Sequence, residues 1–292
     1  MNYDQPVIQL IRKRFSCRTY DTNPISEAHL DSLIQFADDC RLGPLGSRPH
    51  FKIVASREGD SQALRGLGTY GFIKNPVGFI LGACSDAPGS LEDFGYLLEA
   101  ILLRATDLGI GTCWLGGTFT KSRFVQKMDL QNGEFIPSVA SIGYPSDDKA
   151  WMDRMSRLYA GADRRFAWND LFYQDQFGKG LAPSNAGEYQ EPIECVRLAP
   201  SASNKQPWRI VKIDRSWHFY LKRTPNYPVP IFNSLVGIAD LQRIDLGIAM
   251  SHFELSAKEI GLTGSWNTKD PGIELPDKLT EYTTSWYADA SQ

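Results

Sequence analysis

The feature that most constrains the fold of this 292-residue chain is that the sequence repeats itself. The stretch "RLGPLGSRPHFKIV" begins at position 41, and "RLAPSASNKQPWRIV" begins at position 197. The stretch "DFGYLLEAILLRATDLGIGTCW" (93–114) aligns with "DLGIAMSHFELSAKEIGLTGSW" (245–266), and "RKRFSCRTY" (12–20) aligns more faintly with "DRRFAWNDL" (163–171). Because three pairs keep the same order at offsets of 156, 152 and 151 residues, they predict two homologous halves, residues 1–150 and 151–292.

Each half has the sequence pattern of mixed helices and strands. Ser26 is placed to cap a helix ending near Ala37, and 91–108 has the apolar face of a long buried helix. Segments 51–56, 77–85 and 138–148 are short and apolar, as is typical of strands. The stretch 171–192 is rich in Gly, Pro and polar residues, which predicts a connection without regular structure. The expected fold class is α+β.

Composition excludes several classes of partner. A net charge of −3 and a pI near 5.9 give no electrostatic surface for nucleic acid. No apolar run is long enough to span a membrane, and the first residues lack the features of a signal peptide, so we expect a cytoplasmic protein. The five cysteines are scattered and contain no C-x-x-C, which predicts buried reduced thiols rather than disulfides or a metal site.

Three motifs carry polar chemistry. The first is "RKRFSCRTY", in which Arg14, Ser16 and Arg18 stand at alternate positions and share one side of an extended chain. Two guanidinium groups and a hydroxyl on one side can bind a phosphate. A solvated basic helix end gives the same pattern, because arginine is favourable at a helix carboxyl terminus.

The second motif is "PSASNKQPW" (200–208). Its small residues allow close approach of the backbone to a flat ligand, and Asn204 offers both a donor and an acceptor to the edge of a heterocycle. We expect Trp208 to anchor the loop in the core. An ordinary turn before a strand has a similar composition.

The third motif is "LGIGTCWLGG" (108–117), a glycine-rich segment that follows the long helix. Glycines there allow backbone N–H groups to face a cofactor. The segment is neither a Walker loop nor a G-x-G-x-x-G turn between a strand and a helix.

Together, the Arg-x-Ser-x-Arg, Pro-Ser-x-x-Asn-x-Gln-Pro-Trp and glycine motifs, with Gly143-Tyr144-Pro145 further along, resemble the FMN-dependent nitroreductase family. The resemblance implies a nitroreductase-like fold, normally a homodimer with two FMN sites at the subunit interface, and NAD(P)H as reductant. It implies no acid–base residue, with the backbone of Leu115, Gly116 and Gly117 near flavin N5. The cofactor-binding residues that it implies are Arg14, Phe15, Ser16, Arg18, Pro200, Ser201, Ala202, Ser203, Asn204, Leu115, Gly116, Gly117, Lys149 and Arg154.

The motifs are divided between the halves, which departs from the family pattern. The first half keeps Arg14-x-Ser16-x-Arg18 but has "PLGSRPHF" in place of the Pro-Ser loop. The second half keeps the loop but has Arg165, Ala167 and Asn169 in place of the phosphate motif. We therefore expect a fused, intramolecular pseudo-dimer with one composite FMN site, monomeric in solution.

The expected function is hydride transfer from NAD(P)H through the flavin to a nitro, quinone or related small acceptor. A flavin storage or sensing protein and a flavin-free structural relative remain alternatives. His252, on an otherwise apolar helix, is expected to be a core histidine with its polar atoms satisfied.

Overall fold

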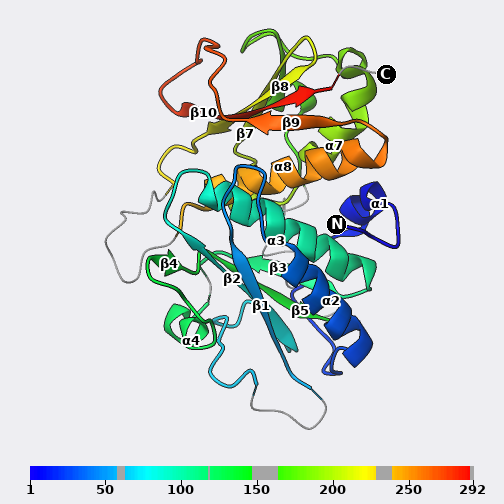
Figure 1. Cartoon of the computed structure of the whole chain (residues 1–292), viewed down its shortest axis with the longest axis vertical. Coiled ribbons are helices and arrows are strands. Elements are labelled where there is room, and N and C mark those ends of the chain that lie inside the picture. The colour runs from blue at the N-terminus through cyan, green and yellow to red at the C-terminus, as the bar shows by residue number, and fades with distance from the viewer. Residues whose placement is uncertain (58–62, 118, 147–163, 228–238, 290–292) are drawn as a thin grey trace.

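Two long helices, α3 (Ser90–Asp107) and α8 (Leu241–Glu259), pack against each other between two β-sheets (Figure 1). The computed structural model of the chain describes residues 1–57, 63–117, 119–146, 164–227 and 239–289. Helix α3 contacts strands of the first sheet, and α8 contacts strands of the second. The mixed α+β class expected from the sequence is confirmed.

The first sheet has the order β1-β2-β5-β3, with all neighbouring strands antiparallel and a short strand, β4, paired to β2. The elements of this part of the chain are α1 (Val7–Lys13), α2 (Glu27–Asp39), β1 (His50–Ala55), β2 (Gly78–Ser85), α3, β3 (Gly111–Leu115), α4 (Lys121–Val125), β4 (Glu134–Phe135) and β5 (Val139–Gly143).

The second sheet has the order β6-β7-β8-β10-β9, in which β6 is parallel to β7 and every other pair is antiparallel. The elements of this part are α6 (Trp168–Leu171), β6 (Phe172–Gln174), the 3-10 helix η1 (Pro183–Tyr189), α7 (Gln190–Leu198), the 3-10 turn η2 (Ala202–Asn204), β7 (Trp208–Ile213), β8 (Ser216–Lys222), α8, β9 (Gly264–Asn267) and β10 (Thr280–Ala288).

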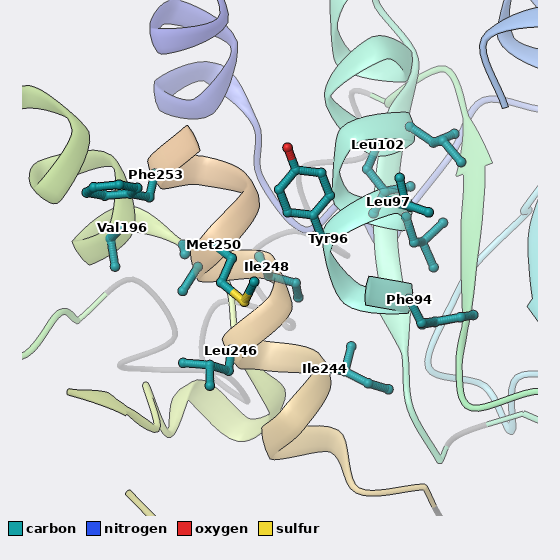
Figure 2. Packing of buried hydrophobic residues seen from close by; sticks show 14 of the residues in the cluster. Phe94, Tyr96, Leu97, Leu102, Val196, Ile244, Leu246, Ile248, Met250 and Phe253 are labelled. Carbon is teal, nitrogen blue, oxygen red and sulfur yellow. The ribbon is translucent and has the colours of Figure 1, made fainter. Parts of the chain in front are cut away.

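The contact between α3 and α8 depends on two glycines. A Cβ atom on Gly95 would clash with the carbonyl oxygen of Ile244, and one on Gly247 would clash with that of Glu92. Because neither glycine has a side chain, the two backbones approach closely. Apolar side chains then fill the surrounding space, as Figure 2 shows for Tyr96, Leu97, Ile248 and Met250, among others.

Most of the predicted elements are confirmed. Ser26 caps α2, its Oγ accepting a hydrogen bond from His29 N at 3.3 Å, and the helix ends two residues beyond Ala37. The segments predicted as strands form β1, β2 and β5, and 91–108 forms α3. All five cysteines are free and buried, as expected.

The expectation of an irregular connection over 171–192 is wrong. This stretch forms β6 and η1, and α7 begins within it. Phe172 and Leu181 are fully buried, and β6 pairs with Ile210–Lys212 of β7. Burial of these apolar side chains, together with backbone pairing at the sheet edge, outweighs the turn-like composition.

The two segments of the faintest repeat pair, 12–20 and 163–171, lie at different places relative to their sheets. Ser16 forms a bridge to Thr112 of β3, whereas α6 and β6 lie against β7, at the opposite edge of the other sheet. The similarity between 12–20 and 163–171 therefore does not correspond to an equivalent position.

Candidate functional site

The Arg14–Arg18 segment runs in extended conformation beside strand β3. Cys17 N donates to Thr112 O at 2.8 Å, which fixes the segment against the strand. Cys17 and Thr19 are buried, while Ser16 and Arg18 are half-buried. This alternation agrees with the expectation that Ser16 and Arg18 share one side of the chain.

Arg14 is held by a buried carboxylate. Its side chain is only 5% exposed, and its Nε lies 3.3 Å from Glu99 Oε1 on α3. Glu99 also accepts hydrogen bonds from Trp114 Nε1 at 2.7 Å and lies 3.0 Å from His252 Nε2 of α8. Burial alone would raise the pKa of Glu99, but the charge of Arg14 and the hydrogen bonds lower it on balance. The carboxylate is therefore ionised near neutral pH.

His252 is a fully buried core histidine, as expected. Its Nδ1 lies 2.9 Å from Cys195 O, and its Nε2 faces Glu99. Since both ring nitrogens have partners, the residue joins α7, α8 and α3 through polar contacts.

The Pro200–Gln206 loop has an unusual backbone. Ser203, Asn204 and Gln206 have φ values of 50°, 53° and 46°, in the left-handed region that non-glycine residues rarely adopt. Such conformations persist only where the surrounding structure fixes them, and they are common at functional sites. Gln206 N donates to Ser201 Oγ at 2.9 Å, and Trp208, which follows the loop, is fully buried as expected.

Asp245, in the second turn of α8, fixes the start of this loop. Its two carboxylate oxygens lie 2.9 and 3.1 Å from Ala202 N. The side chain is buried, and this burial raises its pKa well above the ordinary value, with the Ala202 N–H acting in the opposite direction.

Asn204 is placed differently from the expectation of a side chain open to a heterocycle. Its Nδ2 donates to Arg164 O at 2.7 Å, and Arg165 Nη1 donates to its Oδ1 at 3.3 Å. A ligand would have to exchange these hydrogen bonds to use the amide. Ala202 and Ser201 are half-buried, and Ser203 is exposed.

The glycine loop after β3 reaches the same end of α8. A Cβ atom on Gly116 would lie 2.6 Å from a methyl carbon of Leu241, the first residue of that helix. Leu115 is buried and Gly117 is exposed. The glycine loop and the Pro200–Gln206 loop therefore both contact the first two turns of α8, while the Arg14–Arg18 segment lies along β3, the strand that leads into the glycine loop.

Polar atoms available to a ligand occur in this region. Within the described ranges, Nε and Nη1 of Arg14 and Oγ1 of Thr112 are buried and make no hydrogen bond. An ion pair without a hydrogen bond leaves the donor capacity of a guanidinium unused. Phosphate or carbonyl oxygens match these donors, so the residues present fit a flavin mononucleotide.

The structure brings together residues from all three predicted motifs but does not cover every predicted site residue. Phe15 is 54% exposed beside Arg14. Lys149 and Arg154 lie outside the described residues. In the part of the chain that is described, no three His, Cys, Asp or Glu side chains are placed to share a metal ion, and no helix is long and apolar enough to cross a membrane.

Two residues of the site were missed by sequence reasoning: Glu99 and Asp245. A signal for Asp245 was present, because it begins the repeated stretch that Asp93 begins in the first half. For Glu99 the sequence offers no such signal, since its partners come from the segment after α1, from β3 and from α8.

This α+β architecture, with two loops against the start of α8 and the Arg14–Arg18 segment along β3, defines a protein of the nitroreductase fold. The chain belongs to the family described as "Putative TM nitroreductase", whose model matches residues 6–257. Membership places the chain among enzymes of the nitroreductase group.

Individual relatives agree with this assignment. A protein of Archaeoglobus fulgidus named "Putative NADH dehydrogenase/NAD(P)H nitroreductase" is 26% identical over 174 residues, covering 55% of this chain and 98% of its own. A protein of Methanothermobacter thermautotrophicus with the same name is 27% identical over 157 residues, covering 50% of this chain and 81% of its own.

The fold comparison extends over the whole chain. A crystal structure from Thermotoga maritima, described as a putative nitroreductase, covers 98% of this chain and 95% of its own, with a TM-score of 0.58 and 19% identity. At this level of identity the similarity concerns the fold.

Proposed function

We propose that the chain is an FMN-dependent NAD(P)H oxidoreductase with one composite site. The observation that carries the proposal is that the Pro200–Gln206 loop and the glycine loop contact the same end of α8, while the Arg14–Arg18 segment lies along β3, the strand that leads into the glycine loop. Membership in a nitroreductase family and the NAD(P)H nitroreductase names of two relatives support it.

Different residues of the proposed site would bind different parts of the flavin. Arg14, Ser16 and Arg18 would hold the phosphate, the ribityl chain or the pyrimidine edge, because they combine positive charge with hydrogen-bond donors. The backbone around Leu115, Gly116 and Gly117 would donate hydrogen bonds close to N5. Bound FMN would supply the redox chemistry, in which a hydride from NAD(P)H provides the two electrons needed to reduce a nitro, quinone or related small acceptor.

Two features of the protein hold the proposed cofactor-binding residues in fixed positions. Trp208 and the hydrogen bonds of Asp245 hold the Pro200–Gln206 loop in one conformation beside the site. Glu99 keeps the Arg14 side chain buried against α3. Such fixed positions orient a cofactor without reorganisation at each turnover.

We further propose that the two parts of the chain, 1–150 and 151–292, form an intramolecular pseudo-dimer. Strands β1-β2-β5-β3 and β7-β8-β10-β9 share one sheet order and one antiparallel pattern, and each central helix follows the second strand. Asp93 and Asp245, like Gly95 and Gly247, stand 152 residues apart at corresponding points of those helices. These correspondences support duplication.

The same comparison supports one site per chain rather than two. The first-half loop has neither the asparagine nor the Gln-Pro-Trp of its counterpart. Ser16 lies at the edge of β3, whereas the segment around Ala167 leads to β6 at the edge of β7. Within its described residues, the second half therefore provides no phosphate-binding segment beside β9.

The proposal is tested by titrating the purified protein with FMN and then adding NADH or NADPH without oxygen. We expect about one equivalent of flavin per chain and rapid bleaching of its visible absorbance by at least one nucleotide. Two equivalents would contradict the split-motif argument. Tight FMN that neither nucleotide reduces would favour a storage or sensing protein, and no uptake would favour a flavin-free structural relative.

A matched pair of variants tests, in the same titration, whether FMN binding depends on the first half or on the aligned segment of the second half. Arg18→Ala is expected to weaken FMN binding at least tenfold, because it removes one cation of the phosphate-binding segment. Asn169→Ala changes an exposed residue at the aligned position of the second half and is expected to leave the dissociation constant unchanged. Equal losses in both variants would argue against the assigned site.

A further inference from the structure

Asp245 is a buried carboxylate that accepts hydrogen bonds from a loop and does not pair with a positively charged side chain among the described residues. It is 3% exposed, and both of its oxygens lie within hydrogen-bond distance of Ala202 N. Among the described residues, no lysine or arginine forms an ion pair with it. The nearby Arg243 pairs instead with Glu92, Asp240 and Glu281.

Burying an aspartate without a cation is unfavourable unless hydrogen bonds compensate. A side chain of this kind contributes little to stability in comparison with a well-packed apolar residue. The buried position of Asp245 is therefore better explained by its hydrogen bonds to Ala202, the first residue of η2, than by a contribution to overall stability.

The loop anchored by Asp245 contains strained backbone conformations, which require an anchor to persist. Three of the five residues from Ala202 to Gln206 have positive φ, and each such conformation costs roughly 1 kcal/mol or more in a non-glycine residue. At its far end the loop is fixed by the buried Trp208, and at its near end by the hydrogen bonds to Asp245. Without the near anchor, the backbone can relax away from these strained conformations.

The position of Asp245 on α8 also fixes the Pro200–Gln206 loop relative to the glycine loop. It lies one helical turn after Leu241, whose side chain packs against Gly116 of the glycine loop. One end of a single rigid helix therefore contacts both the glycine loop and the Pro200–Gln206 loop. A change at Asp245 alters the position of one loop relative to the other.

The first half contains a matched carboxylate that serves as an internal control. Asp93 of α3 is fully buried and accepts hydrogen bonds from Leu45 N at 2.8 Å and Ser47 N at 2.7 Å. Burial raises its pKa to about 6, with these hydrogen bonds acting in the opposite direction. The loop it fixes has lost the Pro-Ser-x-x-Asn motif.

We propose that Asp245 is a positioning residue for cofactor binding, which acts by anchoring Ala202 and thereby the strained Pro200–Gln206 loop. The proposal rests on the proposed function, in which that loop contacts the flavin. Asp93 performs the same anchoring in the first half, where no cofactor depends on it.

The test compares Asp245→Ala with Asp93→Ala in the full chain. Asp245→Ala is expected to raise the FMN dissociation constant at least tenfold, and Asp93→Ala less than twofold, although each variant removes a buried helix carboxylate. Asp245→Asn keeps one oxygen facing Ala202 N and is expected to restore affinity to within about threefold of the parent chain. Equal weakening by the two alanine variants, or no weakening by Asp245→Ala, would overturn the proposal.

A second readout uses no cofactor and no activity. In the FMN-free protein, amide hydrogen exchange over 202–206 should accelerate at least tenfold in Asp245→Ala and stay unchanged in Asp93→Ala, with the reverse pattern over 45–47. Unchanged exchange over 202–206 would show that Asp245 does not anchor the loop.

The two failures can be told apart. If the parent chain takes up no FMN, the proposed function fails, and hydrogen exchange alone then decides whether Asp245 anchors the loop. If Asp245→Ala does not fold, Asp245→Asn and Asp245→Ser are compared by exchange and by FMN titration, with serine expected to give the larger loss.

Discussion

At the scale of single residues, a buried polar cluster joins Arg14, Glu99 and His252. The Glu99 side chain is completely buried and contacts Arg14, which directly follows α1, Trp114 of β3 and His252 of α8. Removing one member of a buried ion pair leaves the other charged and unpaired, which costs much more than the pair itself contributes.

We expect Glu99→Gln to lower the free energy of unfolding by about 3 kcal/mol and to weaken FMN binding, because Arg14 loses its counter-charge. In a double-mutant cycle, adding Arg14→Met should recover part of the lost stability, since an apolar side chain does not need a buried partner. Chemical denaturation measures both effects. Glu191→Gln is the control: Glu191 pairs with the exposed guanidinium of Arg12, so the expected loss is smaller.

The difference in stability between the parent chain and Glu99→Gln should depend on pH in a definite direction. The folded pKa of Glu99 is lowered from its ordinary value of 4.5, so its stabilisation is present above pH 4.5 and is lost as the pH falls through the folded pKa. The stability gap between the parent chain and Glu99→Gln should therefore narrow in acid. A gap that is constant down to the acid unfolding transition would contradict this assignment.

At the scale of elements, the contact between α3 and α8 depends on Gly95 and Gly247. Each glycine faces a backbone carbonyl of the other helix, and backbone cannot move aside as a flexible side chain can. The helices therefore need glycine at both points, even though glycine is unfavourable in a helix interior.

We expect Gly247→Ala to lower the free energy of unfolding by about 2 kcal/mol or more, because the new methyl group forces the helices apart. Gly68→Ala is the matched control: its Cβ would meet Thr120 Oγ1 at 3.3 Å, so the change should stay within about 1 kcal/mol. Thermal and urea unfolding of the two variants give the comparison. A Gly247→Ala protein as stable as the parent chain would show that the helices can separate without loss.

The elements also show what the sequence could and could not predict. The apolar periodicity of 91–108 and the cap at Ser26 predicted α3 and α2, because both signals are local. Strand β6 was missed, since three residues carry no periodicity and its partner β7 lies further along the chain. In the site, the motifs located both loops, but the anchoring of Ala202 by Asp245 joins residues that only the tertiary fold brings together.

At the scale of the whole molecule, one chain contains every residue proposed for the site. A site shared between two subunits loses its cofactor when the subunits dissociate on dilution, whereas a site within one chain does not. The parts contributed by the Arg14–Arg18 segment and by the Pro200–Gln206 loop are joined covalently here.

We therefore expect the FMN dissociation constant to be independent of protein concentration from nanomolar to micromolar. Fluorescence titration at several concentrations measures the constant, and light scattering establishes the mass in parallel. The expected state is a monomer of 32.7 kDa. A dissociation constant that rises on dilution, together with a change in mass, would mean that a second chain completes the site.

The contact between Glu99 and His252 has one more consequence. The positions 152 residues away from these two are Ser251 and Ala100, so the polar pair occurs on one side of the central helix contact and not on the other. In an assembly of two identical chains, every substitution is made twice, and a buried charge must be tolerated at both places. In the proposed pseudo-dimer, each side can acquire its own residues one mutation at a time, so one side can specialise while the other preserves the packing.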